Sequence, residues 1–183
     1  MCRAVVTFTL IYLARTTKKV KSQGDGIMLN SFKGLLADWK QTRSITLEFI
    51  SQLSDADFDK QLPRKELNTI RLQLEELAAM QEDWQAAMST KTMDFSESYA
   101  LMDTSRQGLA AKFAELDHQL ETLLASLDGS EVIDWYGNEK SIYEHFSSMI
   151  SHEMMHIGQI IAFCYATGIH IPGVITEEMA LQG

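Results

Sequence analysis

The sequence has few of the residues that break helices or cross-link small folds. Its 183 residues include two prolines and ten glycines, which is few for a turn-rich sandwich of this length and favours an all-α fold. Cys2 and Cys164 are the only cysteines, and they form no C-x-x-C motif. The sequence therefore gives no sign of a disulfide framework, and a reducing cytoplasm is the simplest predicted location.

Basic charge is also scarce. The formal net charge is −9 at pH 7, and the calculated pI is near 5.0. Nucleic-acid binding needs a basic surface that displaces counterions from phosphates, so no nucleic-acid partner is expected. The apolar stretch AVVTFTLIYLA at 4–14 is shorter than the roughly 20 residues that cross a bilayer, so no membrane partner is expected.

Residues 1–27 differ from the rest of the chain. They carry five basic residues and one acidic residue, and helical periodicity begins only at Met28. This segment is interpreted as an N-terminal extension, upstream of the native start and outside the core. A weak targeting segment and an extra strand are the alternatives. We expect residues 28–183 to form one domain, because their number suits a single core.

The apolar residues from position 28 onward recur with the period of an α-helix. Their spacing predicts four helices, at about 31–53, 67–89, 98–127 and 140–167. Polar stretches with proline, glycine or asparagine separate them, and no confident strand is expected after residue 27. The predicted fold is an all-α four-helix bundle with a short irregular C-terminal tail.

The fourth predicted helix carries a polar stripe. At 3.6 residues per turn, one face presents His145, Ser148, His152, His156 and Gln159. Burying such groups without partners costs about 1–3 kcal/mol each, which a helical core does not normally accept. The stripe therefore predicts either a bound ligand or internal hydrogen-bond partners.

His152 and His156 begin and end the sequence HEMMH and lie one helical turn apart, about 6 Å along the axis. Both imidazoles can reach one ion at the usual ~2.0–2.1 Å, and this spacing favours a metal site. His145 is two turns from His152, about 10 Å away, and is expected to be a hydrogen-bonded core residue. Glu153 and Gln159 are the candidates for a catalytic or ligand-orienting role.

A third ligand must come from another helix. In TIRLQLEEL at 69–77, the apolar stripe includes Gln73 and has Glu76 at its edge, whereas Glu75 points away from it. Glu76 with His152 and His156 would form a two-histidine, one-carboxylate set, which leaves coordination positions open for a substrate.

HEMMH also matches the H-E-x-x-H motif of zinc peptidases, in which the glutamate is the general base. Such enzymes usually hold the peptide substrate along the edge of a sheet, and no such sheet is expected here. A zinc peptidase is therefore the third hypothesis, behind a metal-dependent enzyme and a metal-free bundle that binds a ligand or partner.

The segments TIRLQLEELAAMQEDW and SHEMMHIGQIIAFC, with the linker IDWYGNEKS and the tail GIHIP, resemble the DinB-like (YfiT-like) family of metalloenzymes. The resemblance covers about residues 30–172. It implies a four-helix bundle, usually a homodimer, in which three histidines hold a divalent ion. Two of them match His152 and His156. The third falls on Glu76, so this chain departs from the family pattern at one ligand.

The resemblance implies that zinc or nickel is the first choice of ion, and iron or manganese the next. Characterised relatives include enzymes that use a low-molecular-weight thiol, as S-transferases or as an isomerase. A thiol S-transferase, or a related hydrolase or isomerase, is the activity implied for this chain. With glutamate at position 76, a metal-free bundle that binds a small ligand or a partner is the alternative.

Overall fold

The computed structural model describes residues 28–95 and 103–181, and the extension predicted at 1–27 lies outside the described residues. The elements in chain order are α1 (Met28–Gln52), α2 (Asp55–Phe58), α3 (Ile70–Thr90), α4 (Arg106–Ser126), β1 (Val132–Trp135), β2 (Asn138–Ser141), α5 (Ile142–Thr167) and α6 (Gly173–Glu178). The prediction of a mostly helical protein is confirmed.

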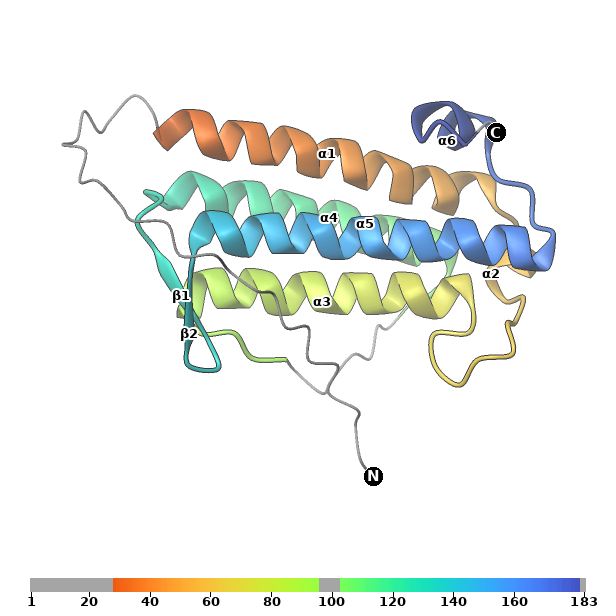
Figure 1. The fold of residues 1–183 in the computed structure, drawn as a ribbon, viewed down its shortest axis with the longest axis horizontal. Helices are drawn as coiled ribbons and strands as arrows, with labels where there is room; N and C mark the ends of the chain where they lie inside the picture. The colour runs from red at the N-terminus through yellow and green to blue at the C-terminus, as the bar shows by residue number, and fades with distance from the viewer. Residues whose placement is uncertain (1–27, 96–102, 182–183) are drawn as a thin grey trace, which may run out of the picture.

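Four long helices pack side by side along most of the structure (Figure 1). α1 and α5 run in one direction, whereas α3 and α4 run in the other. α1 packs against α4 and α5, and α3 packs against the same two helices. Each long helix therefore buries one face against two neighbours. Two clusters of buried side chains, one toward each end of the helices, form the core between them.

The helix ends are set by capping residues. The side chain of each N-cap residue accepts a hydrogen bond from a backbone N–H in the first turn of its helix. These residues are Thr69 for α3, Ser105 for α4 and Ser141 for α5. Such a cap contributes about 0.5–2 kcal/mol to stability. The predicted helices 67–89 and 140–167 therefore begin two or three residues too early. The helix predicted at 98–127 begins at Arg106, and its residues 98–102 lie outside the described part.

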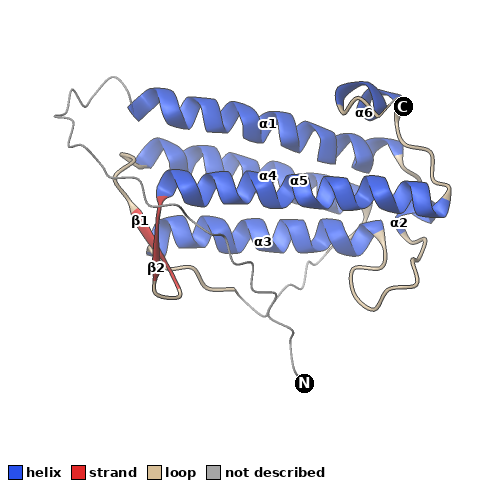
Figure 2. Cartoon of the chain, viewed as in Figure 1, coloured by secondary structure: helices blue, strands red, loops and turns tan. Residues whose placement is uncertain are grey.

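A β-hairpin between α4 and α5 corrects the expectation that no strand follows residue 27 (Figure 2). β1 and β2 pair antiparallel, with Ile133 opposite Lys140 and Trp135 opposite Asn138. The two residues between the strands, Tyr136 and Gly137, have φ angles of 53° and 88°. Positive φ at both central positions suits the right-handed twist of a two-residue hairpin turn. The strands have four residues each, too few for periodicity to reveal.

The C-terminal tail is also more regular than predicted. After Gly168 ends α5 in a left-handed conformation, the chain turns back and forms α6, which packs against α1. Ile175 of α6 is fully buried, and this contact orders a helix that is too short to show a periodic pattern in the sequence. Within the described ranges, no helix is both long and apolar enough to cross a membrane.

Candidate metal centre

Glu76 of α3 meets His152 and His156 of α5 in the interior of the helical domain. One donor atom from each of the three side chains lies within 4.8 Å of the other two. The shortest separation that the structure gives is 3.2 Å, between His156 Nε2 and Glu76 Oε2. The structure thus brings together the three residues that the sequence predicted as metal ligands.

The antiparallel course of α3 and α5 explains why these residues meet. Moving toward the C-terminus on α5 is equivalent to moving toward the N-terminus on α3. Trp84 and His145 share one level, joined by a hydrogen bond between the Trp84 carbonyl and His145 Nε2. Glu76 lies about two turns earlier on α3, which places it opposite His152 and His156.

The donor atoms have few partners of their own. Both ring nitrogens of His156 and the Oε2 atom of Glu76 are buried and lack a hydrogen-bond partner among the described residues. His156 is 1 % exposed, whereas the Glu76 side chain is 31 % exposed. Leaving such polar atoms unpaired costs about 1–3 kcal/mol each. The described residues therefore leave these atoms available to a ligand such as a metal ion.

Electrostatics keep the two imidazoles neutral at pH 7. Burial lowers the pKa of His156 to about 4, with smaller contributions in the same direction from His152 and Arg64. Burial also lowers the pKa of His152. The 3.2 Å contact between His156 and Glu76 is consequently not an ion pair at neutral pH, and neutral imidazole nitrogens can donate their lone pairs to a metal.

Burial raises the pKa of Glu76, and Arg64 opposes that shift. A dication beside Glu76 would favour its charged form, because an opposite charge lowers the pKa of a carboxyl group.

The donor set fits a divalent ion. Metal–ligand distances of about 2.0–2.2 Å place neighbouring ligand atoms about 2.8–3.6 Å apart, from octahedral to tetrahedral geometry. The 3.2 Å separation of His156 Nε2 and Glu76 Oε2 lies in that range, and the His152 donor atom is within 4.8 Å of both of the other donors. Two imidazoles and one carboxylate suit zinc, nickel, iron or manganese, and three protein ligands leave positions open.

Two amide side chains, one of them fully buried, lie near the triad on α3 and α5. Gln73 of α3 is 0 % exposed, and neither its Oε1 nor its Nε2 has a hydrogen-bond partner among the described residues. Gln159 of α5 is half-buried, and its buried Oε1 atom has no hydrogen-bond partner within the described part of the chain. The antiparallel register places both amides near the level of His156. Gln159 was among the predicted site residues, whereas Gln73 was noted only as part of the apolar stripe.

Glu153, between the two histidines in sequence, faces a different side of α5. Its Oε2 lies 2.9 Å from Arg43 Nη2, and its Oε1 accepts a 2.6 Å hydrogen bond from Thr46 Oγ1. Burial raises the pKa of Glu153, and both partners act in the opposite direction. Arg43 also contacts Gln81 and Asp117. This buried network on the α1 side was not predicted, although Arg43 interrupts an otherwise apolar face.

His145 has partners on both ring nitrogens, as expected of a core histidine. Its Nδ1 accepts a 3.0 Å hydrogen bond from Trp135 Nε1, so its Nε2 donates to the Trp84 carbonyl at 2.9 Å. Cys164 is fully buried, and burial raises the pKa of its thiol to about 11. Neither residue therefore offers a free reactive group next to the triad.

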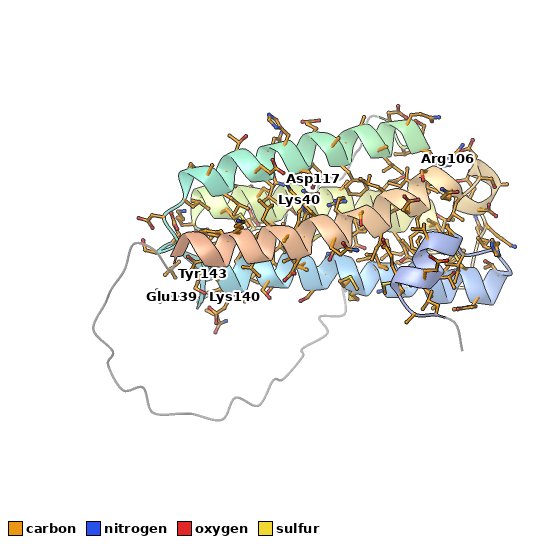
Figure 3. All side chains as sticks on the ribbon, turned by 90° about the horizontal axis from the view of Figure 1, so that it is seen from above. Lys40, Arg106, Asp117, Glu139, Lys140 and Tyr143 are labelled. Atoms are coloured by element: carbon orange, nitrogen blue, oxygen red, sulfur yellow. The ribbon has the colours of Figure 1, made fainter. Side chains whose placement is uncertain are left out.

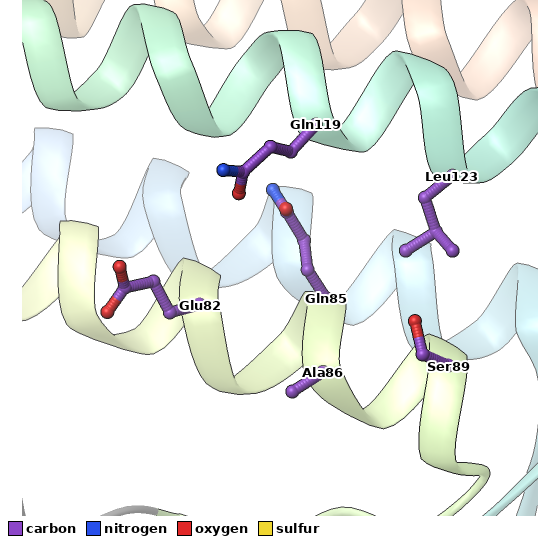
Figure 4. A pocket seen from close by; sticks show the side chains of 6 residues that line it. All are labelled: Glu82, Gln85, Ala86, Ser89, Gln119 and Leu123. Atoms are coloured by element: carbon purple, nitrogen blue, oxygen red, sulfur yellow. The ribbon is translucent and has the colours of Figure 1, made fainter.

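Figure 4 shows a separate pocket on the outer side of α3 and α4. Its lining residues are Glu82, Gln85, Ala86, Ser89, Gln119 and Leu123. Gln85 Nε2 donates to the Leu116 carbonyl, so the deepest amide of this pocket already has a partner. No residue of the triad takes part in it, and we assign no site there.

Comparison with known families agrees with this geometry. A sequence model of the DinB superfamily matches residues 38–160, which include α3, the hairpin and most of α5. A comparison with curated proteins gave no match. The matched region contains all three triad residues and covers more than half of the chain. The chain belongs to the DinB superfamily.

Proposed function

We propose that this protein is a divalent-metal-dependent enzyme that transfers a low-molecular-weight thiol to a small electrophilic substrate. The proposal treats α1, α3, α4 and α5 as a four-helix bundle that carries the metal site between α3 and α5. The observation that supports it most directly is the convergence of Glu76, His152 and His156, whose donor atoms lie within 4.8 Å of one another.

Each triad residue has a defined task. His152 and His156 are neutral at pH 7 and offer lone pairs, while Glu76 supplies one negative charge. Bound by these groups, a divalent ion would favour the deprotonated form of a coordinating thiol, and the thiolate is the reactive nucleophile. With glutamate in the third position the site is one charge less positive than a three-histidine site, so it suits a moderately acidic thiol better than a weakly acidic one.

In the proposed transfer, the thiolate sulfur forms a bond to an electrophilic carbon of the second substrate. The bond from that carbon to the leaving group breaks, and the leaving group departs with the electron pair. The thiol proton passes to solvent when the thiolate forms, so the proposed step uses no side chain as a general base. The buried amide of Gln73 and the buried Oε1 atom of Gln159 have hydrogen-bonding capacity to orient polar parts of a substrate.

The peptidase alternative requires Glu153 to act as a general base beside the ion. Both carboxylate oxygens of Glu153 are engaged by residues of α1, Arg43 and Thr46. β1 and β2 form a two-stranded hairpin with four residues in each strand, which offers little edge for an extended peptide. The geometry therefore favours a small-molecule substrate.

The metal content of protein purified without a histidine tag tests the proposal. We expect about one ion per chain in the wild type, with loss of most of that metal in His156→Ala and Glu76→Ala. Glu75→Ala is the matched control, because Glu75 is the neighbouring carboxylate and is not part of the triad. A metal-free wild type whose thermal stability is unchanged by divalent ions would favour the alternative, a metal-free bundle that binds a ligand or partner.

Thiol chemistry needs its own assay. Mixtures of low-molecular-weight thiols and a chromogenic electrophile should react faster with the metal-loaded protein than with the Glu76→Ala variant. A rate equal to background in the metal-loaded wild type would rule out the transferase and leave the metal site in place. The homodimer and the cytoplasmic location stay predictions.

A further inference from the structure

Lys140 occupies an unusual position on the hairpin. Its partner across the strands is the buried Ile133, so its side chain lies on the face that packs against the helices. Lys140 Nζ lies 3.7 Å from the centroid of the Trp135 ring and 3.5 Å from Ser148 Oγ. No carboxylate of the described residues is within ion-pair distance of it. Among the residues that the structure describes, the half-buried ammonium group thus has no counter-ion.

The start of α5 makes this position less favourable for a cation. Lys140 directly precedes the N-cap Ser141, at the positive end of the helix dipole. The described acid whose charge acts on Lys140 is Glu144, and its Oε2 accepts hydrogen bonds from the backbone N–H and the hydroxyl of Ser141, both at 2.8 Å. Burial lowers the pKa of Lys140, and Glu144 only partly opposes this. Positions that break a local stability rule in this way are commonly functional ones.

A continuous set of ring contacts connects Lys140 with the metal centre. The Trp135 ring beneath its ammonium packs against Trp84 with centroids 5.0 Å apart. Trp84 in turn packs against His152, at a centroid distance of 6.3 Å. Ser148 lies one helical turn before His152 on the same face of α5. Figure 3 shows Lys140 close to Tyr143, at the hairpin end of the helices.

We propose that Lys140 and Ser148 form an anion-binding subsite beside the metal centre, which holds a carboxylate carried by the thiol substrate. This inference rests on the proposed function, since it places the carboxylate of the molecule whose sulfur the metal would bind. The ammonium would form a charge-assisted hydrogen bond with the carboxylate. The Ser148 hydroxyl donates to the Glu144 carbonyl at 2.8 Å and accepts from Lys140 Nζ at 3.5 Å, so it would position the ammonium. The helix dipole of α5 would favour the same charge.

Matched pairs of thiols test the subsite by binding instead of turnover. Cobalt(II)-loaded protein is titrated with 3-mercaptopropionate and 3-mercaptopropanol, and with 6-mercaptohexanoate and 6-mercaptohexanol. The sulfur-to-cobalt charge-transfer band reports the Kd of each. Within each pair only the head group changes, so the ratio of Kd values isolates the carboxylate, and two lengths allow for the span from the triad to Lys140.

The measured quantity is the Kd of the alcohol divided by the Kd of the matching carboxylate. For at least one chain length, we expect this ratio to be about tenfold larger in the wild type than in Lys140→Met. Lys140→Arg should keep most of the preference. Lys40→Met is the control, because Lys40 pairs with Glu121 across α1 and α4 and should not alter the ratio. Ser148→Ala should weaken the preference in part, and it gives a second variant should Lys140→Met fail to fold.

The outcomes separate the two proposals. Cobalt binding and a thiol band with no carboxylate preference in the wild type would overturn the subsite and leave the metal centre intact. A preference that Lys140→Met and Ser148→Ala both retain would do the same. A wild type that binds no cobalt, or binds cobalt but gives no band with any of the four thiols, would overturn the proposed function and the subsite together.

Discussion

Arg43 Nη2 and Glu153 Oε2 lie 2.9 Å apart in the core, and neither side chain is more than 4 % exposed. The Arg43 guanidinium also packs over the Phe113 ring, 4.0 Å from its centroid, so α1, α4 and α5 meet at this ion pair. Glu153 is adjacent to His152 in sequence but lies on another side of α5. The pair therefore fixes the rotation of α5 that turns His152 and His156 toward α3.

Breaking this pair should be costly. Arg43→Met leaves the Glu153 carboxylate buried without its counter-ion, which destabilises proteins by about 3–5 kcal/mol. The free energy of unfolding from urea titration measures the loss. Lys40→Met breaks the exposed pair with Glu121 and should cost less than about 1 kcal/mol. Equal effects of the two substitutions would show that the buried pair does not hold the helices together.

The stability of the protein should depend on pH through His145. Burial lowers the pKa of His145 from 6.5 to about 4, so between these values the unfolded chain binds more protons than the folded one. The free energy of unfolding therefore falls as the pH is lowered from 6.5 toward 4, by up to about 3 kcal/mol from this residue.

His145→Gln should flatten that pH dependence in urea titrations between pH 7 and pH 4. His152 and His156 contribute in the same direction, so the difference between variant and wild type isolates His145. His118→Gln is the control, because it removes an exposed histidine of α4 instead of a buried one. Identical slopes for His145→Gln and the wild type would contradict the assignment.

Cys164 should be inert in the folded protein. Its side chain is 0 % exposed, and burial raises its pKa to about 11, so the reactive thiolate is scarce at pH 8. In a Cys2→Ser background, Ellman's reagent should label Cys164 only in the presence of denaturant. Rapid labelling without denaturant would show that the thiol is accessible and would admit a cysteine nucleophile, which the proposed mechanism does not need.

The long helices could be predicted because each buries one face, so its apolar residues follow the helical period. The hairpin could not, since Ile133 and Trp135 are covered only once α3 and α5 are in place. Tertiary cover, which a sequence pattern does not show, decides the structure of such short strands.

The candidate site shows the same division. His152 and His156 were predicted together because one helical turn fixes their spacing regardless of the rest of the fold. The prediction of Glu76 as a ligand depended on which face of α3 lies against α5. The position of Glu76 at the edge of the apolar stripe of α3 indicated that face. Arg43 was missed because nothing local indicates that a cation on α1 has a buried acid as its partner. The Lys140 position was missed for a related reason, since the hairpin that presents it was not expected.

The identity of residue 76 should set which ion the protein prefers. Imidazole suits zinc and nickel, whereas carboxylate suits harder ions such as manganese. Glu76→His, which restores the histidine that the family resemblance implies, should therefore shift the ratio of zinc to manganese Kd values by about tenfold toward zinc, or ~1.4 kcal/mol. Competition with a chromogenic chelator measures both constants.

A matched variant separates ligand type from charge in that experiment. Glu76→Gln removes the negative charge but keeps the size of the side chain, so it should weaken both ions without favouring zinc. We expect the two variants to differ in their zinc-to-manganese ratio, because Glu76 Oε2 lies 3.2 Å from His156 Nε2. A histidine at position 76 offers a ring nitrogen as a ligand in place of that oxygen. If Glu76→His and Glu76→Gln gave the same zinc-to-manganese ratio, residue 76 would not be a ligand.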